Sequence, residues 1–301
     1  MTLLNFLQTC SRQYALASLV IGAIMISFSG VWVKVSHVPS VVSAFYRVFF
    51  GGLILLIPAL TNHEVKWHGR RHLMLGLVCG FFFAFDLAFY HLSVNYVGPG
   101  LGTILPNFQV LILVGIGILL FKEKVRPLFL ISIPLAFIGL LLIVGVEWGQ
   151  LGPDYKFGIY CGLAAAACYS GFLLSLRKLQ ADHIGISSFY VLTLVSLVTA
   201  AMLGVEVWHG GHSFRIPDLQ SLLALLALGL FSQSVGWILI TNALPCIRAS
   251  LSGFILLLQP ALAFIWDVLF FQRPTDLTNW IGVALALAAI YIGTTMRSQN
   301  K

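Results

Sequence analysis

Ten long apolar segments, separated by short polar loops, constrain this chain more than any other feature of its sequence. They lie near residues 14–36, 41–60, 72–94, 97–121, 127–146, 157–176, 186–205, 219–240, 247–270 and 279–296. Each is close to the roughly 20 apolar residues that a helix needs to cross a bilayer. Hydrophobic residues make up 59% of the 301 residues and charged residues only 9%, a balance that excludes a water-soluble domain because large apolar patches would be exposed. The sequence therefore predicts an all-α integral membrane protein with ten transmembrane helices.

The second five apolar segments repeat the first five. Matches 141, 144 and 150 residues apart relate Phe28-Ser29-Gly30-Val31 to Tyr169-Ser170-Gly171-Phe172, Ser43-Ala44-Phe45-Tyr46 to Ser187-Ser188-Phe189-Tyr190, and Gln109 to Gln259. Because five spans is an odd number, the second copy must enter the membrane with the opposite orientation. The sequence therefore predicts two five-helix inverted repeats, residues 1–146 and 147–301, an arrangement used by alternating-access transporters.

Basic residues lie in alternate short loops, as the positive-inside rule expects. With the N-terminus inside, twelve of the seventeen Lys and Arg residues fall on the cytoplasmic side and four on the other. The face with few basic residues carries five acidic residues: Glu147, Asp154, Glu206, Asp218 and Asp276. The net charge of +7 is thus explained by the orientation of the chain in the membrane and does not indicate nucleic-acid binding. Both termini are expected to be cytoplasmic.

The sequence carries none of the motifs that would indicate a familiar enzyme. A nucleotide-binding loop, HExxH, GxSxG and a Cys/His metal spacing are all missing from it, which argues against an ATP-driven pump or a recognised hydrolase. The five cysteines lie in or at the edges of the predicted spans: Cys10, Cys79, Cys161, Cys168 and Cys246. We expect them to be small apolar packing residues, and we expect no cofactor and no metal.

The end of the first repeat resembles a known family. The stretch from Phe85 to Ser93 and the stretch from Gly100 to Gln109 lead to Glu123 and, sixteen residues later, to Gly139. This glutamate-to-glycine spacing is similar to the end-of-repeat signature of the EamA-type drug/metabolite transporter superfamily. The resemblance covers nearly the whole chain.

The second half follows the same pattern with two departures. Pro260, Gly282 and Ala289 occupy places equivalent to those in the first repeat. Val110 stands where the family usually has proline, and Gln272 or Arg273 stands where a second glutamate would fall.

The resemblance implies a secondary, non-ATP, alternating-access transporter that exports small polar or amphipathic metabolites such as amino acids. It implies a central cavity lined mainly by spans one, three, four, six, eight and nine, and a multi-pass protein of a bacterial inner membrane. The expected partners are a small-molecule substrate and the lipid bilayer, and a homodimer is compatible with the sequence. The alternative is a membrane-embedded enzyme or a receptor that uses the same cavity.

Asp86 is the most unusual side chain, because it lies about eight residues, or roughly 12 Å, from one end of span three. A carboxylate at that depth is costly unless it is paired, hydrated or protonated. Helical spacing puts Phe82, Phe83, Tyr90 and Ser93 on its face. This aromatic stripe favours a cationic or amphipathic ligand, whereas the alternative is a structural ion pair.

Two further residues are candidates for coupling. Arg47 lies in span two at nearly the depth of Asp86, so that the two charges can pair. His91 points to another face of span three. Its titrating role is weighed against the commoner one of a hydrogen-bonded packing residue.

Uncharged polar and aromatic residues complete the predicted substrate site. Gln109 and Gln259 are mid-span and symmetric, so they are expected to bind polar substrate groups from opposite sides of the pseudo-axis. The remaining candidates are Thr103, Asn107, Gln233, Trp237 and Trp32. Hydrogen bonding between helices is the competing explanation for the polar members.

Overall fold

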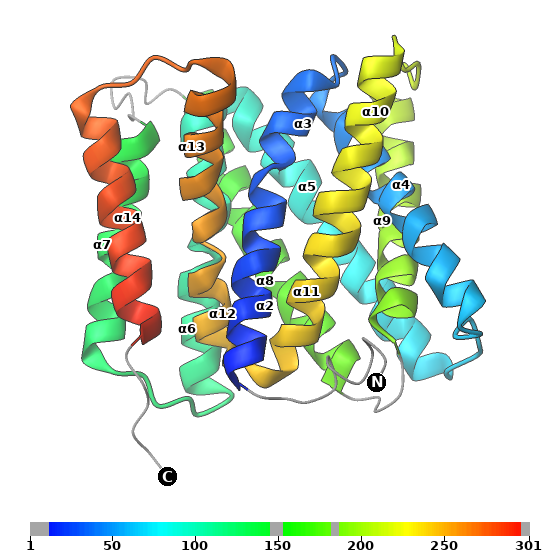
Figure 1. The fold of residues 1–301 in the computed structure, drawn as a ribbon, viewed down its shortest axis with the longest axis horizontal. Coiled ribbons are helices and arrows are strands. Elements are labelled where there is room, and N and C mark those ends of the chain that lie inside the picture. The colour runs from blue at the N-terminus through cyan, green and yellow to red at the C-terminus, as the bar shows by residue number, and fades with distance from the viewer. Residues whose placement is uncertain (1–11, 145–152, 182–186, 296–301) are drawn as a thin grey trace. The chain divides into compact units, whose positions relative to one another are not determined.

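The computed structural model describes residues 12–144, 153–181 and 187–295 (Figure 1). The described residues are helical with short loops and contain no strand. They form two compact units, Met1–Ala88 with Cys168–Ile247 (unit 1) and Phe89–Ala167 with Arg248–Lys301 (unit 2). Each unit therefore combines segments from both halves of the sequence.

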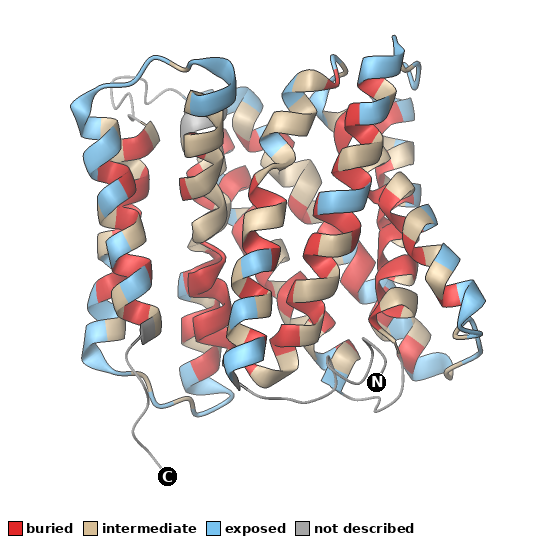
Figure 2. Ribbon diagram, viewed as in Figure 1, coloured by how far each residue is buried: buried red, intermediate tan, exposed pale blue. Residues whose placement is uncertain are grey.

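Among the residues that the structure describes, ten helical segments are long and apolar enough to cross a membrane, as predicted. They are Gln13–Val35, Ser40–Thr61, Arg70–Val97, Leu101–Leu119, Pro127–Val144, Pro153–Ala181, Ser188–His209, Leu219–Cys246, Ala249–Phe271 and Leu277–Thr294. Large apolar side chains remain exposed along these helices, including Ile57, Leu119 and Tyr291 (Figure 2). Such exposure is expected where lipid rather than water is the solvent.

Unit 1 contains parts of α5 (Arg70–Ile104) and α8 (Pro153–Ala181), whose remaining residues belong to unit 2, together with several complete helices. The others are α2 (Arg12–Ser27), α3 (Ser29–Val35), α4 (Ser40–Thr61), α9 (Ser188–His209), α10 (Leu219–Ala227), the π-helix η2 (Leu228–Gly236), α11 (Trp237–Ala243) and η3 (Leu244–Cys246). The first span is divided between α2 and α3 at Phe28. Ser27 and Ser29 there donate hydrogen bonds to the backbone oxygens of Ile24 and Ile26, a pattern that bends helices.

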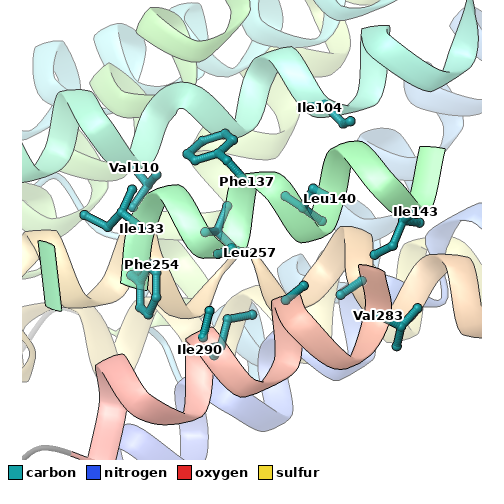
Figure 3. Close-up of a cluster of buried hydrophobic side chains, with 14 of the residues drawn as sticks. Ile104, Val110, Ile133, Phe137, Leu140, Ile143, Phe254, Leu257, Val283 and Ile290 are labelled. Carbon is teal, nitrogen blue, oxygen red and sulfur yellow. The ribbon is translucent and has the colours of Figure 1, made fainter. Parts of the chain in front are cut away.

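Unit 2 contains η1 (Leu105–Phe108), α6 (Gln109–Leu119), α7 (Pro127–Val144), α12 (Ala249–Ile255), α13 (Leu258–Phe271) and α14 (Leu277–Thr295). Its core is a cluster of buried aliphatic and aromatic side chains from these helices, drawn in Figure 3. Phe137 and Leu140 of α7 and Phe254 of α12 are among its members. Burial of each such side chain contributes about 2 kcal/mol in water, but in lipid the gain comes from close packing.

Helices α7 and α14 cross where both carry small residues. A Cβ atom added to Gly139 would lie 2.7 Å from the backbone oxygen of Gly282 and 2.6 Å from the backbone nitrogen of Ala286. Gly282 and Ala286 are one helical turn apart, the spacing that lets transmembrane helices approach closely. The two glycines of the family resemblance thus form the contact between these helices.

The chain reverses direction between spans three and four. A Cβ atom at Gly102 would lie 2.8 Å from the Cα atom of Val94, whereas eight residues of straight helix span about 12 Å. The reversal therefore falls between Val94 and Gly102.

Equivalent turns end spans four and nine. Lys122 and Gln272, which are 150 residues apart like Gln109 and Gln259, both adopt a left-handed backbone with φ of 51°. The next residue differs between the turns, because Glu123 follows the first and Arg273 the second. Arg273 pairs with Asp267 at 3.6 Å and lies 5.1 Å from the centre of the Phe264 ring, so it takes over the place expected for a second glutamate.

Glu123 caps the start of α12. Its carboxylate accepts hydrogen bonds from the backbone N–H of Ala249 at 2.9 Å and from both the backbone N–H and the hydroxyl of Ser250. Gly117 makes room for it, since a Cβ atom at that position would lie 2.6 Å from Glu123 Oε2. The signature glutamate therefore ties the loop after span four to the beginning of span nine.

Glu123→Ala is expected to destabilise the detergent-solubilised protein by about 2 kcal/mol, because the donors of Ala249 and Ser250 lose their acceptor. Glu123→Gln retains one acceptor oxygen and should lie between the wild type and the alanine variant. Thermal unfolding followed by fluorescence measures the effect, with Lys124→Ala as the neighbouring control. Equal melting temperatures for Glu123→Ala and Lys124→Ala would show that the cap does not stabilise the fold.

Asp218 caps α10 from outside the membrane-spanning segments. Its Oδ1 accepts a hydrogen bond from the backbone N–H of Ser221 at 2.7 Å, and its Oδ2 lies 3.8 Å from Nδ1 of His37. The bond from the Ser221 backbone, with further help from the Ser221 side chain and from His37, lowers the pKa of Asp218 below its ordinary value.

A carboxylate whose pKa is lowered by folding contributes stability above its unfolded pKa of about 3.9 and loses this contribution as the pH falls through the folded pKa. The difference in melting temperature between wild type and Asp218→Ala should therefore be largest above about pH 5 and shrink as the pH approaches 3. Ser187→Ala removes an uncharged cap, since Ser187 accepts from the N–H of Phe189, and its effect should not change with pH. A difference for Asp218→Ala that stays constant from pH 6 to 3 would contradict the assignment.

The cysteines follow the prediction in part. Cys79, Cys161 and Cys168 are free, and Cys79 and Cys161 are buried in helices. Cys246 is disulfide-bonded, so the expectation that it is only a packing residue was wrong. Cys10 lies outside the described residues.

Candidate functional site

A polar chain of three side chains crosses the middle of unit 1. Nε of Arg47 on α4 donates to Oε1 of Gln233 at 3.2 Å, and Nε2 of Gln233 donates to Oγ of Ser196 on α9 at 3.0 Å. Gln233 and Ser196 are buried, and Arg47 is half-buried. Both ends of the Gln233 amide are thereby engaged, which fixes its orientation.

The π-helical turn η2 and a glycine place Gln233 in this chain. The wider turn is held by Ser234, whose hydroxyl lies 2.9 Å from the oxygen of Gly229 and 3.2 Å from the oxygen of Gly51. A Cβ atom at Gly51 would come within 2.4 Å of Cγ of Gln233, so only glycine lets α4 approach closely enough. Single π-helical turns occur frequently at functional sites in membrane and soluble helices.

Asp86 on α5 is the buried carboxylate of this region. Its exposed fraction is 7%, and its charge interacts electrostatically with Arg47. Cys168 on α8 also lies within electrostatic reach of it. Arg47 is thus within electrostatic range of Asp86, their pairing stays a prediction, and the hydrogen bond from Arg47 to Gln233 was not predicted.

An aromatic cluster adjoins these groups. Phe83 stacks on Phe172 with ring centres 4.3 Å apart, Phe172 meets Trp237 edge-on at 4.8 Å, and Tyr169 lies 6.2 Å from Phe172. Trp237 is only 2% exposed, yet its indole N–H has no hydrogen-bond partner among the described residues. A buried indole donor usually finds an acceptor, so this group is available to an acceptor on a ligand.

Two other predicted site residues, Phe82 and Trp32, also pack against residues of unit 1. The ring of Phe82 packs against Gly171, where an added Cβ atom would lie 2.9 Å from it. Trp32 on α3 stacks on Phe231 with ring centres 6.1 Å apart, and its buried N–H also has no partner within the part of the chain that the structure describes.

Gln109 and Gln259 lie in unit 2 in equivalent surroundings. Each stands in the first turn of a helix that restarts after a break, since η1 precedes α6 and a short turn separates α12 from α13. Broken spans of this kind often surround the substrate in transporters, because backbone groups and helix ends become accessible there.

The two glutamines differ in their contacts. Gln109 is fully buried, and its Nε2 donates to the backbone oxygen of Gly253 on α12 at 3.1 Å. Nε2 of Gln259 is buried with no hydrogen-bond partner among the described residues. The structure therefore provides Gln109 with a helix–helix hydrogen bond, the alternative weighed for it, and leaves the donor of Gln259 for a ligand.

The other predicted residues of unit 2 have mixed surroundings. Asn107 donates to the backbone oxygen of Thr103 one turn earlier, at 2.7 Å. Tyr90 and His91 have ring centres 5.5 Å apart, and Nδ1 of the buried His91 has no partner within the described ranges. The predicted set is thus divided between the units, with Trp32, Arg47, Phe82, Phe83, Asp86, Gln233 and Trp237 in unit 1 and the rest in unit 2.

Sequence reasoning missed Ser196 and the contact between Gly51 and Gln233. Both are small residues in apolar spans, where small residues usually serve only helix packing. Their positions near the middle of their spans are the one signal that could have indicated them. The hydrogen-bond chain itself joins residues 37 and 186 positions apart, and no local pattern predicts such contacts.

Comparisons with known proteins agree with this architecture. The EamA-like transporter family matches residues 13–145 and 156–295. An uncharacterized transporter of Clostridium kluyveri is 26% identical over 264 residues, covering 84% of this chain and 82% of that protein. The uncharacterized transporter YxxF of Bacillus subtilis is 22% identical over 294 residues, covering 96% of this chain and 92% of the relative.

A solved crystal structure has the same fold. It aligns with a TM-score of 0.77 at 19% sequence identity, covering 93% of this chain and 99% of the other. Together with ten helices that can span a membrane, the comparisons identify a multi-pass membrane protein of a transporter family. The chain belongs to the EamA-like transporter family.

Proposed function

We propose that this protein is a secondary transporter that moves small polar or amphipathic metabolites, such as amino acids, out of a bacterial cell by alternating access. The observation that carries this proposal is that the half-buried Arg47 and the buried Gln233, Ser196 and Asp86 lie in the middle of membrane-spanning helices. Intramembrane charged residues are costly and commonly mark a substrate or ion pathway.

The chemistry of these groups suits a zwitterion. A guanidinium binds a carboxylate through charge-assisted hydrogen bonds, and a carboxylate such as that of Asp86 binds an ammonium group. The apolar rings of Phe83, Phe172 and Trp237 next to them suit the side chain of an amphipathic molecule. The charged groups of the substrate would replace part of the electrostatic interaction between Arg47 and Asp86. The resulting change in charge balance would couple substrate binding to the conformational change of the transporter.

Inverted repeats at residues 1–146 and 147–301 are part of this proposal. The equivalent turns at Lys122 and Gln272 and the equivalent helix restarts at Gln109 and Gln259 support it. We assign both termini to the cytoplasm of a bacterial inner membrane on the basis of the charge asymmetry of the loops.

The two glutamines provide the test of the binding site. Gln259→Ala should weaken uptake of a radiolabelled mixture of amino acids into proteoliposomes at least tenfold without changing the melting temperature. Gln109→Ala should lower the melting temperature, because the bond to Gly253 is lost. Unchanged uptake in a well-folded Gln259→Ala protein would remove that residue from the site.

Cysteine labelling in intact cells tests the orientation. A cysteine at Asp154 should react with a membrane-impermeant maleimide added outside, and a cysteine at Lys124 should react only after the membrane is opened. Lys124 lies between two spans, and Asp154 is the second residue of the span Pro153–Ala181. The reverse pattern of labelling would refute the topology.

A further inference from the structure

Helices α4 and α9 of unit 1 run side by side (Figure 1) and form an apolar groove on their surface. The groove has a volume of about 500 Å³ and is open along its length. The residues that line it are apolar and include Phe45, Phe49, Leu197, Ala201, Gly204 and Trp208. None of these residues belongs to the polar chain of the candidate substrate site.

The groove exists because of a glycine and a loop anchor. Gly204 forms part of its floor, where a Cβ atom would lie 3.2 Å from the ring of Phe45. Phe214, in the loop after α9, meets the Phe45 ring edge-on at 5.1 Å, and its backbone oxygen accepts a hydrogen bond from the hydroxyl of Tyr46 at 2.6 Å. The loop is thus held over one end of the groove. From there the groove extends along α9.

The length of the groove corresponds to one leaflet of a bilayer. Trp208, near the end of α9, and Leu197 are eleven residues apart, which is about 16 Å of helix. Half of the hydrocarbon core is about 15 Å. The exposed fraction of Trp208 is 73% and that of Val205 is 53% in the whole chain, so the groove is open to the surrounding lipid.

A basic residue stands beside the interfacial end of the groove. Arg215 follows Phe214 directly, and it forms no ion pair with any residue that the structure describes. The neighbouring charged groups are engaged elsewhere, since Glu206 interacts with His212 and Asp218 lies 3.8 Å from His37. An apolar channel with an aromatic residue and a free guanidinium at its headgroup end complements an anionic phospholipid.

We infer that this groove binds one acyl chain of an anionic phospholipid, with the phosphate at Arg215. A volume of 500 Å³ is in the range of small-molecule sites. Since the residues that line the groove are apolar, the headgroup contact at Arg215 selects the lipid and the groove holds its chain.

Photocrosslinking in nanodiscs tests the inference. The probes are phosphatidylglycerol and phosphatidylcholine that carry the same diazirine-labelled acyl chain, and crosslinked peptides are identified by mass spectrometry. We expect crosslinks on α4 and α9 within the groove, at least threefold more abundant for phosphatidylglycerol. Ala201→Phe, which fills the groove from its exposed side, should reduce them at least threefold, and Leu223→Phe, an equally apolar change at an exposed position of α10, should not.

Arg215→Gln should leave the crosslinks in the groove but remove the preference for phosphatidylglycerol. Val205→Trp provides a second groove-filling variant if Ala201→Phe does not yield folded protein. Equal crosslinking by the two lipids that neither groove-filling variant changes would identify ordinary surrounding lipid and overturn the inference. Crosslinks between two protein chains across the groove would also overturn it, in favour of a dimer interface.

Discussion

Gly282→Ala is expected to lower the melting temperature of the detergent-solubilised protein by several degrees, although glycine-to-alanine changes inside helices usually raise stability by about 0.8 kcal/mol. The reason is the crossing of α7 and α14. The backbone oxygen of Gly139 would lie 2.7 Å from the added Cβ atom, and the backbone nitrogen of Ile143 would lie 2.8 Å from it. Backbone atoms cannot rotate away, so the helices must separate, at an expected cost of about 2 kcal/mol or more.

Gly115→Ala is the matched control in the same unit, because no atom lies within 4 Å of the Cβ atom that it adds. It should leave the melting temperature unchanged or raise it. Gly139→Ala should behave like Gly282→Ala, since the two glycines face each other. Similar melting temperatures for Gly282→Ala and Gly115→Ala would show that the crossing is less tightly packed than the structure indicates.

Asp86→Asn is expected to destabilise the protein, because it removes the electrostatic interaction with Arg47 in a membrane-buried region. It should also abolish transport. The double variant with Arg47→Gln removes both charges and should recover most of the folded protein. The glutamine at position 47 does not reproduce the bond from Arg47 to Gln233, so a small loss of stability should remain.

The double variant separates a structural pair from a functional one. If Asp86 takes part in transport, folding recovers in the double variant while uptake and its pH dependence do not. Fluorescence-detected size exclusion measures folded protein, and proteoliposome uptake measures transport. Recovery of both would remove Asp86 from the mechanism.

The sequence was sufficient to predict the spans because their signal is local. Each predicted segment overlaps an observed one, and the first helix of the second repeat, expected at 157–176, is extended to Pro153–Ala181. Helix ends are set by caps and loops, such as Asp218 before α10, rather than by hydropathy. The π-helical turn at Leu228–Gly236 lies within an apolar run and leaves no mark in a hydropathy pattern.

The candidate site could be predicted only residue by residue. The sequence indicated Asp86, Arg47 and Gln233 as unusual for a membrane span, which follows from the cost of burying each one. It did not indicate that Gln233 lies between Arg47 and Ser196, because these contacts join helices that are far apart in the chain. Likewise, the repeat suggested identical roles for Gln109 and Gln259, and only their neighbours distinguish them.

Uptake from a complex mixture tests the proposed function most directly. Proteoliposomes are exposed to an isotopically labelled bacterial metabolite extract without ATP, and their contents are identified by mass spectrometry. Wild-type protein should admit one or a few small polar compounds, chemically unchanged and in a saturable manner, whereas the Arg47→Gln, Asp86→Asn double variant should admit them no faster than protein-free liposomes. A new compound made from the extract, or no compound that enters faster than into protein-free liposomes, would contradict transport as the function of this protein.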